Sequence, residues 1–248
     1  MKVHTYSEWE KYGVVAGYST DLEGLYRYNE PEDRTHFEEL GKVCDIPASR
    51  MIRLHQEHTD KILFVDETNG GEGTIREGTP EGYDGLITRE KDFMLLVVTA
   101  DCTPVFLYDP TCGAVGMLHS GRAGTMKEIA GKAVERMESK YGSLPQNIQC
   151  ILGPYLCAKH HEVERKDIEG FYETFTEAEC KRILTQKGIK YYVDMGEAIR
   201  ISLIKKGVLD TNIKDYHVCT YEDKSLYSWR RDHLPHKRII SYVCMKGL

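Results

Sequence analysis

The sequence predicts an α+β fold, in which mixed β-sheets pack together under covering helices in a single domain, residues 1–248. Four short apolar runs follow one another between residues 84 and 118 with no helical segment between them. This pattern indicates meandering or mixed strand pairing instead of a doubly wound parallel sheet. The run 93–99 does not alternate with polar residues, so we expect a strand buried on both faces. No repeat or low-complexity linker divides the chain.

In the first third of the chain, short aliphatic and β-branched runs predict strands, and one apolar-periodic stretch predicts a helix. The expected strands are 13–19, 51–55 and 61–65, and the expected helix is 36–44. A polar loop is expected through 29–33. The glycine-rich stretch 67–83 is the longest loop candidate, and loops of that length in compact domains tend to be functional or disordered.

The rest of the chain alternates between further strands and three helices. Residues 125–140 are the clearest helix, because Ile129, Ala133 and Met137 fall on one stripe. The other helices are expected near 176–186 and 196–206. The expected strands are 84–88, 93–99, 105–108, 114–118, 148–152, 190–193, 213–219 and 238–244.

The composition is that of a globular protein with 41% hydrophobic residues and a net charge of −6. That charge argues against a nucleic-acid backbone as the main partner, although it leaves small anionic ligands open. The first residues lack the apolar core of a signal peptide, and no window approaches 18 uninterrupted apolar residues, so we expect a cytoplasmic protein without a membrane anchor. The eight cysteines are accordingly expected to be reduced, and most of them buried.

Three residues that can carry chemistry stand where probable strands give way to turns. Cys102 ends the apolar run that begins at Phe93, His119 ends the next apolar run, and His58 closes the segment 54–58. Two imidazoles and a thiolate match a catalytic zinc site, which keeps three protein ligands and one open position. The competing interpretation is a Cys102 nucleophile activated by His119. Both interpretations remain open at this point, and the metal site is the preferred one.

The turn Ser120-Gly-Arg-Ala-Gly-Thr125 is a separate signal. It joins a strand to the clearest helix, and exposed N–H groups at a helix start favour anions such as phosphate. The plainer interpretation is a glycine-rich turn in which Thr125 caps the helix. The segment has neither the P-loop nor the Rossmann pattern of nucleotide-binding proteins.

Two further polar clusters receive a structural interpretation first. The stretch 227–232 combines aromatic residues with Arg230, Arg231 and a carboxylate, and a solvated charge cluster is the default interpretation. The segment His160-His161-Glu162 resembles a metal-binding pair only superficially, because adjacent residues of a strand point to opposite faces, so we interpret it as not binding a metal.

Taken together, eight segments of the chain resemble one known family. They are 56–58, 84–88, 99–104, 119–125, 153–154, 162–163, 219–220 and 227–232, and Thr-Ala-Asp-Cys-Thr-Pro followed by His-Ser-Gly-Arg-Ala-Gly-Thr is the most specific part. The chain resembles the family once called multicopper polyphenol oxidases or laccases, the bacterial YfiH-like purine nucleoside phosphorylases, over nearly its whole length. The resemblance implies one YfiH-like catalytic domain in which His58, Cys102 and His119 bind the catalytic zinc.

The resemblance also implies a reaction. The family would phosphorolyse adenosine, inosine, guanosine and methylthioadenosine to the free base and ribose-1-phosphate, and deaminate adenosine in the same site. The partners would then be a purine nucleoside and phosphate, with neither nucleic acid nor membrane, and the oligomeric state is left open. Substrate contacts are expected from Asp84, Arg122, Thr125, Arg230 and Arg231.

The sequence departs from the family pattern at three places. Arg122 stands at the usual tryptophan position and Ala123 at the usual arginine position, so Arg122 is carried over only as a substitute. His161 stands where a tyrosine is usual, and Pro-His-Lys at 235–237 replaces Thr-Gly-Arg. Specificity for the base or the ribose could differ accordingly.

Three alternatives accompany the leading hypothesis. A copper-dependent polyphenol oxidase is disfavoured, because multicopper oxidases use paired His-x-His ligands and this chain has none. A metal-free cysteine hydrolase acting on peptidoglycan precursors would use Cys102 as its nucleophile. The non-enzymatic alternative is a zinc-stabilised interaction module, although a structural zinc usually has four protein ligands. Elemental analysis of the purified protein separates these alternatives.

Overall fold

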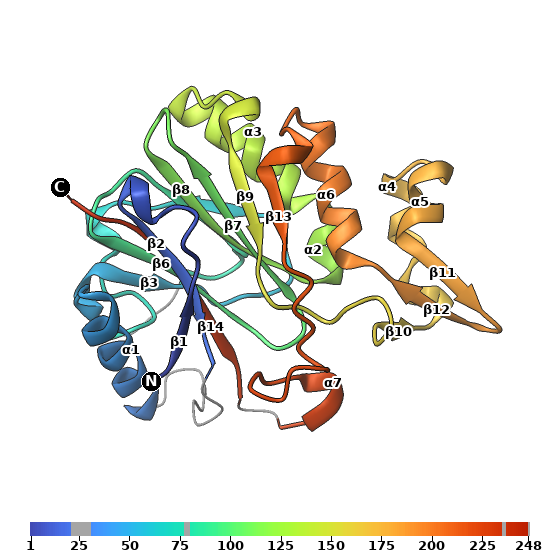
Figure 1. Cartoon of the computed structure of the whole chain (residues 1–248), viewed down its shortest axis with the longest axis horizontal. Helices are drawn as coiled ribbons and strands as arrows, with labels where there is room; N and C mark the ends of the chain where they lie inside the picture. The colour runs from blue at the N-terminus through green and yellow to red at the C-terminus, as the bar shows by residue number, and fades with distance from the viewer. Residues whose placement is uncertain (21–30, 77–79, 235–236, 248) are drawn as a thin grey trace.

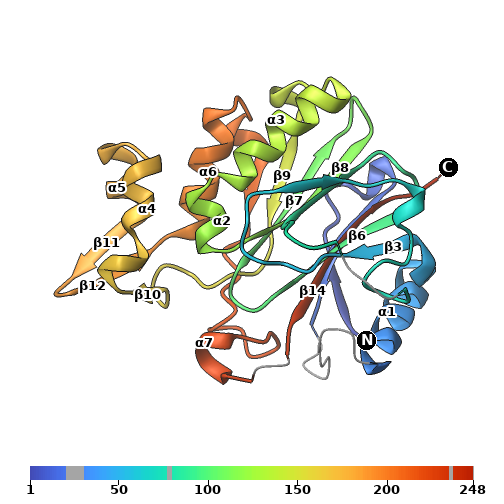
Figure 2. The same cartoon turned by 180° about the vertical axis from the view of Figure 1, so that it is seen from behind.

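The chain folds, as predicted, into an α+β architecture of mixed sheets with helices over their faces (Figures 1 and 2). The computed structural model describes residues 1–20, 31–76, 80–234 and 237–247. Two large sheets form the centre, and a small third sheet with two short helices extends to one side of them (Figure 1). None of the helices in the described ranges is long and apolar enough to cross a membrane.

The first sheet brings the two ends of the chain together. Its order is β1 (Val3–Thr5), β2 (Val14–Ser19), β14 (Ile239–Met245), β6 (Phe93–Thr99) and β3 (Met51–Arg53). The strand β14 is antiparallel to both β2 and β6, whereas β3 is parallel to β6. The helix α1 (Pro31–Cys44) covers one face of this sheet through the buried side chains of Phe37 and Leu40.

The second sheet carries the functional residues. Its order is β13 (Ile213–Asp215), β9 (Gln149–Leu152), β7 (Thr103–Asp109), β8 (Ala114–Ser120), β5 (Gly85–Thr88) and β4 (Ile62–Phe64). Its outer face is covered by α3 (Ile129–Tyr141) and α6 (Met195–Lys205). The predicted stripe of Ile129, Ala133 and Met137 is fully buried in this layer.

The strand β6 is buried on both faces, as its unbroken apolar run predicts. Phe93, Leu95 and Val97 face the second sheet, where they join a core that includes Phe106 and Met117 of that sheet. Met94 and Leu96 point the other way, into the core under α1. The two large sheets are therefore packed face to face through the alternating side chains of this strand.

The smaller third sheet consists of β10 (Glu162–Val163), β12 (Lys190–Val193) and β11 (Leu184–Lys187). Together with α4 (Glu169–Thr174) and α5 (Glu177–Ile183) it encloses a core of its own around Phe171 and Ile183. Met195 and Ile201 of α6 join this core, so the same helix packs against both the central sheet and the extension.

The structure corrects several predicted boundaries. The helix expected at 125–140 is two helices, α2 (Arg122–Met126) and α3, because Glu128 takes the left-handed conformation at φ 56° and interrupts the hydrogen-bond ladder. The helix expected at 176–186 ends at Ile183, where the chain continues as β11. The strand expected at 213–219 ends at Asp215.

Other differences concern short elements. The charge cluster at 227–232 contains a helical turn, α7 (Trp229–Asp232), capped by the Ser228 side chain. The short elements β1, β10 and α4 were not expected from the sequence. The expected polar loop at 29–33 falls partly outside the described residues, as does part of the long loop at 67–83, and residues 31–33 belong to α1.

Candidate metal centre and its pocket

His58, Cys102 and His119 lie together at one edge of the second sheet. The pairing of Thr103 with Ser120 joins the start of β7 to the end of β8, which places Cys102 beside His119. His58 reaches them from the turn between β3 and β4. The three ligand atoms lie within 4.8 Å of one another, and the Cys102 Sγ is 3.8 Å from the His58 Nε2. Residues 61 positions apart in the sequence thus form one compact cluster.

A buried carboxylate holds this cluster in place from below. Asp84, fully buried just before β5, accepts a 2.6 Å hydrogen bond from the Nδ1–H of His119. It also accepts hydrogen bonds from the backbone N–H groups of Glu57, His58 and Thr59, and from the Thr59 hydroxyl. The carboxylate therefore orients the His119 ring and fixes the turn that carries His58.

The backbone around the cluster is locally strained. His58 and Asp101 have positive φ angles of 60° and 83°, a region that non-glycine residues rarely adopt. The Asp101 carboxylate is held by hydrogen bonds from the Thr220 hydroxyl and the Arg230 N–H. At Gly121, a Cβ atom would lie only 2.5 Å from the His58 ring, so only glycine allows this close approach.

The three side chains also shift one another's protonation. Burial alone would raise the pKa of Cys102, but the neighbouring His119 and His58 imidazoles lower it to about 6. Burial would lower the pKa of His119, but the Cys102 thiolate and the Asp84 carboxylate raise it to about 9. The pKa of Asp84 itself is lowered to about 2, against its burial, by His119 and Thr59. The Cys102 sulfur is therefore a thiolate at neutral pH, as metal ligation or nucleophilic attack requires.

The cluster fits a metal of the zinc type. Thiolate and imidazole are donors that zinc accepts, and a carboxylate on the second nitrogen of a ligating histidine is the usual supporting contact. Because the Nδ1 of His119 is engaged by Asp84, its Nε2 is the atom left for a metal. His119 is buried, Cys102 is half-buried and His58 is exposed, so the cluster is open on the side of His58.

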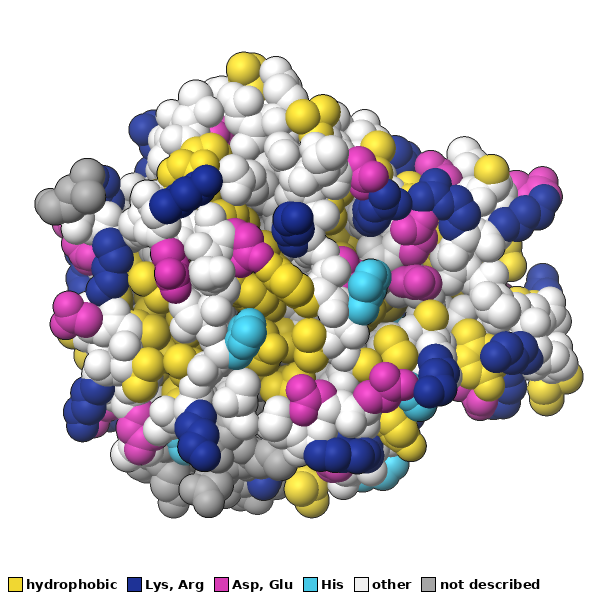
Figure 3. Space-filling view, in the orientation of Figure 1, with side chains coloured by type: hydrophobic (Ala, Val, Ile, Leu, Met, Phe, Trp, Pro, Cys, Tyr) yellow, Lys and Arg dark blue, Asp and Glu magenta, His cyan; other side chains and the backbone are white. Residues whose placement is uncertain are grey.

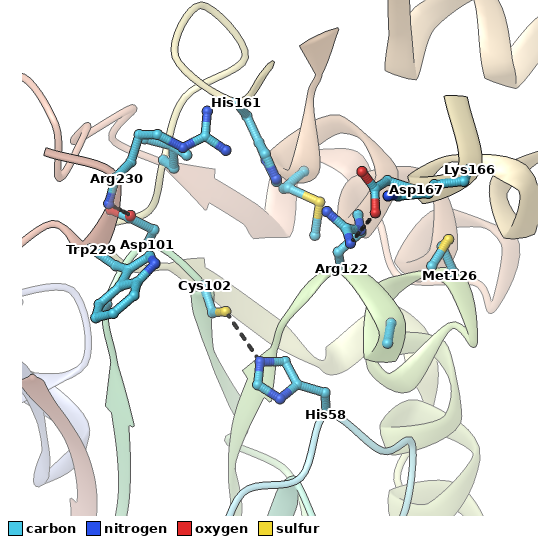
Figure 4. Close-up of a pocket in the computed structure, with 14 residues that line it drawn as sticks. His58, Asp101, Cys102, Arg122, Met126, His161, Lys166, Asp167, Trp229 and Arg230 are labelled. Atoms are coloured by element: carbon cyan, nitrogen blue, oxygen red, sulfur yellow. Dashed lines mark hydrogen bonds and ion pairs between the residues drawn. The ribbon is translucent and has the colours of Figure 1, made fainter. Parts of the chain in front are cut away.

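That open side faces a cavity of about 470 Å³, within the size range of small-ligand sites (Figure 4). His58, Asp101 and Cys102 line this cavity, and Arg122, Lys166, Asp167 and His161 supply further polar groups. The apolar part of the wall comes from Ala100, Ala123, Met126, Leu156, Met195 and Trp229. An apolar wall with a few convergent polar groups is typical of small-ligand sites.

Two polar side chains of the pocket stand out. Arg122 enters it from α2 and pairs with Asp167 at 2.8 Å (Figure 4). His161 points toward Arg122 from the loop before β10 (Figure 4). Its Nδ1 is buried and has no hydrogen-bond partner among the described residues. Burial, together with Arg230 and Arg122, lowers the pKa of His161 to about 4, so the ring is neutral at neutral pH.

Of the five expected substrate contacts, the structure brings Arg122 and Arg230 to the pocket wall. The guanidinium of Arg230 is already bound to the carbonyl oxygens of His160 and Glu162. Asp84 lies outside the cavity lining, and its contacts are with His119 and with the turn that carries His58.

Thr125 and Arg231 also lie outside the cavity lining. Thr125 does not cap a helix, since Gly121 is the N-cap of α2, and its buried hydroxyl is 2.7 Å from the Ser120 hydroxyl. Arg231 is a structural clamp that donates to the Asp232 carboxylate and to the carbonyl oxygens of Thr220, Tyr221, Asp223 and Leu226. The five-residue α2 is also too short to supply the helix-start anion site that the turn suggested.

Sequence reasoning did not select Lys166, Asp167 or Met126, which belong to no motif with a chemical signature, and it interpreted the stretch that contains Trp229 as a charge cluster. His161 could have been found, since it is one of the three places where the chain departs from the family pattern. His160 and His161 are not in a strand, as the sequence interpretation assumed, but in the turn before β10. The two rings nevertheless lie in different surroundings. His161 lines the pocket, whereas His160 contacts the Glu222 carboxylate.

Comparisons with known proteins agree with this architecture. A family model described as multi-copper polyphenol oxidoreductase laccase matches residues 27–246. Among curated proteins, the purine nucleoside phosphorylase YlmD of Bacillus subtilis is 31% identical, with 94% of this chain and 89% of that protein covered. A purine nucleoside phosphorylase of Bacteroides thetaiotaomicron is 29% identical, with 81% and 75% covered.

Solved structures give the same result. The hypothetical protein YfiH of Bacillus licheniformis superposes with a TM-score of 0.91 at 25% identity, covering 98% of this chain and 96% of that one. YlmD from Geobacillus stearothermophilus gives a TM-score of 0.86 at 25% identity, covering 95% and 93%. The resemblance inferred from the motifs is therefore confirmed for the fold and for the family.

Proposed function

Since the chain belongs to the multi-copper polyphenol oxidoreductase laccase family, we propose that it is a zinc-dependent purine nucleoside phosphorylase that also deaminates adenosine. The products of phosphorolysis would be the free base and ribose-1-phosphate, from adenosine, inosine, guanosine or methylthioadenosine. The names of curated relatives support this reaction class. The observation that carries the proposal is the three-ligand cluster of His58, Cys102 and His119, which opens into a cavity with a cation on its wall.

Phosphorolysis requires an anion held beside the ribose C1′. Arg122 is the best placed cation, because its guanidinium lines the cavity and is held by a single carboxylate, that of Asp167. Lys166 adds a second positive charge to the same wall. Arginine binds phosphate oxygens through two parallel N–H groups, which fixes the orientation of the anion as well as its position.

The purine would lie against the apolar part of the wall. Trp229 and Met126 offer apolar surface on which a flat base can pack. The neutral His161 ring has a buried Nδ1 that can exchange a hydrogen bond with the edge of the base. A bound purine would therefore satisfy a polar atom that has no partner among the described residues.

Deamination at the same place requires an activated water. A zinc ion bound by His58, Cys102 and His119 would lower the pKa of a water molecule at its open position, for attack on C6 of adenine. Asp84 keeps the His119 ring oriented for ligation through its 2.6 Å contact with Nδ1.

The test is direct. Zinc-loaded protein is incubated with adenosine in the presence and absence of phosphate, and adenine, inosine and ribose-1-phosphate are separated by chromatography. We expect phosphate-dependent adenine and phosphate-independent inosine, both abolished by Cys102→Ala. The matched control is Cys112→Ala, which removes another half-buried thiol from the turn between β7 and β8. The absence of both products from wild type would refute the proposal.

Elemental analysis of the same preparation tests the alternatives. Zinc bound in proportion to protein, and lost in Cys102→Ala, supports the phosphorylase. Copper in its place, with oxidation of a phenol, would favour the polyphenol oxidase. A metal-free protein whose Cys102 thiolate, with its pKa of about 6, hydrolyses a peptidoglycan precursor would favour the cysteine hydrolase.

A further inference from the structure

Outside the pocket, two turns that are distant in sequence lie side by side. One turn leads into β10 and the other follows β13, and a parallel bridge between Tyr155 and Cys219 joins them. The bridge is closed by hydrogen bonds from the Tyr155 N–H to the Val218 carbonyl and from the Thr220 N–H to the Tyr155 carbonyl. Side chains from both turns therefore meet over a fixed backbone pair.

Each turn presents two metal-binding side chains three residues apart. In the first turn they are Cys157 and His160, and the His160 N–H donates to the Cys157 carbonyl at 3.0 Å. In the second they are Cys219 and Glu222, and the Glu222 N–H donates to the Cys219 carbonyl at 3.2 Å. This spacing and geometry make each turn a bidentate unit, as in zinc sites built from Cys-x-x-Cys pairs.

The four ligand atoms are close enough to share one ion. They all lie within 4.8 Å of one another. Two thiolates at about 2.3 Å from a tetrahedral zinc are roughly 3.8 Å apart, so the two sulfurs need to approach by at most about 1 Å to share the ion. The His160 Nε2 is already 2.9 Å from the Glu222 carboxylate, and the Cys157 N–H is 3.5 Å from the Cys219 sulfur.

We infer that Cys157, His160, Cys219 and Glu222 form a second metal site, which binds a zinc-type dication with four protein ligands. A complete set of four ligands is typical of structural zinc, in contrast to the three ligands of the pocket cluster. Two thiolates and one carboxylate around a dication leave one net negative charge. Lys159, whose ammonium lies 3.0 Å from the Glu222 carboxylate, offsets that charge.

The second site would stabilise the pocket wall. The carbonyl of His160 accepts a 2.7 Å hydrogen bond from Arg230, and the N–H of Arg230 binds the Asp101 carboxylate. Thr220, next to Cys219, donates to the same carboxylate at 2.6 Å. Asp101 directly precedes Cys102 in the chain. An ion that joins the two turns would therefore hold in place the contacts that support the strained backbone beside the first cluster.

The experiment counts bound metal, and one pair of substitutions in each cluster reports on that cluster separately. Full-length protein is purified with reductant and excess zinc, freed of loose metal, and analysed for zinc and protein. We expect two zinc ions per chain in wild type, and one in either Cys157→Ser/Cys219→Ser or His58→Ala/Cys102→Ala. Cys112→Ser, a matched thiol outside both clusters, should keep two.

Cobalt provides a spectroscopic readout for each site separately. With Co²⁺ in place of zinc, His58→Ala/Cys102→Ala should retain thiolate-to-cobalt absorption, and adding Cys157→Ser/Cys219→Ser should remove it. Added zinc should also raise the melting temperature of the first variant but not of the combined one. A zinc content that stays the same in wild type and in Cys157→Ser/Cys219→Ser, or a Cys157–Cys219 disulfide that persists in place of the metal, would overturn the inference.

A surface substitution guards against loss of folding in the cysteine variants. Glu222 is half exposed, so Glu222→Gln leaves the fold intact, and we expect it to weaken the second zinc at least tenfold in competition with a chelator. Glu177→Gln, which changes another exposed glutamate paired with a lysine, is the control. Equal zinc affinity in the two variants would contradict the assignment of Glu222.

Discussion

The strongest prediction concerns Asp84, because a single carboxylate supports both histidines of the metal cluster. The substitution Asp84→Asn keeps the size of the side chain and removes its charge. Asp84 accepts hydrogen bonds from His119, from three backbone N–H groups and from the Thr59 hydroxyl. An asparagine has only one acceptor oxygen, so its amide N–H₂ must face N–H donors on one side.

The magnitude follows from those contacts. If the amide nitrogen takes the place of Oδ1, the N–H groups of His58 and His119 lose their acceptor. If it takes the place of Oδ2, the backbone N–H groups of Glu57 and Thr59 lose theirs. Two lost hydrogen bonds to a buried charge cost about 3–6 kcal/mol of unfolding free energy in the metal-free protein. Loss of the supporting carboxylate should weaken metal binding about 10- to 100-fold, which corresponds to about 1.4–2.7 kcal/mol.

The assay is zinc competition against a chelator of known affinity, with urea unfolding of the metal-free protein in parallel. The control is Asp109→Asn, a buried carboxylate at the opposite end of β7, roughly 20 Å from the start of that strand. We expect Asp109→Asn to leave zinc affinity unchanged. If Asp84→Asn binds zinc as tightly as wild type, the supporting role of this carboxylate is refuted.

Three further predictions follow from the pocket and its electrostatics. The pKa of Asp84 is about 2 in the folded protein and about 3.9 in the unfolded chain. The ionised carboxylate therefore stabilises the fold fully above pH 3.9, and this stabilisation is lost as the pH falls to 2. The metal-free difference in unfolding free energy between wild type and Asp84→Asn should thus shrink by about 2–3 kcal/mol from pH 5 to pH 2; a constant difference would refute the shift. His161→Phe should lower kcat/KM for adenosine about tenfold without lowering the melting temperature, and His161→Gln should lower kcat/KM less. Unchanged kinetics in His161→Phe would show that His161 does not bind the base. Arg122→Ala should raise the KM for phosphate at least tenfold and leave the KM for adenosine unchanged. Asp167→Asn, which frees the Arg122 guanidinium from its carboxylate, should lower the KM for phosphate. An equal rise of both KM values in Arg122→Ala would contradict the binding of phosphate by Arg122.

The face of the molecule shown in Figure 3 carries no second concentration of positive charge among its described residues. Figure 3 shows basic and acidic side chains interspersed around that face, with hydrophobic side chains between them. A continuous basic patch of the kind used for phosphate backbones is not visible on the described part of this face. Among the described residues, the cations that line the pocket are Arg122, Lys166 and Arg230.

The sequence by itself determined the features that depend on neighbouring residues. The unbroken run 93–99 predicted a doubly buried strand, and the stripe at Ile129, Ala133 and Met137 predicted a covering helix, because burial imposes a local period on the chain. The ends of apolar runs also identified Cys102 and His119, since side chains at strand ends meet at a sheet edge. The break at Glu128 was not predictable, because one residue in the left-handed region leaves the apolar period almost unchanged.

Only the tertiary structure decided which polar groups meet. It separated Arg122, which lines the cavity, from Thr125, which is buried against Ser120 in the same turn. It also brought the turn at Cys157 beside the turn at Cys219, 62 residues later, through the backbone bridge between Tyr155 and Cys219. Such contacts depend on how sheets and loops pack over long sequence separations, and no local pattern of hydrophobicity or charge records that packing. The sequence therefore identifies His58, Cys102 and His119 as candidate metal ligands, whereas the cluster of Cys157, His160, Cys219 and Glu222 is visible only once the chain is folded.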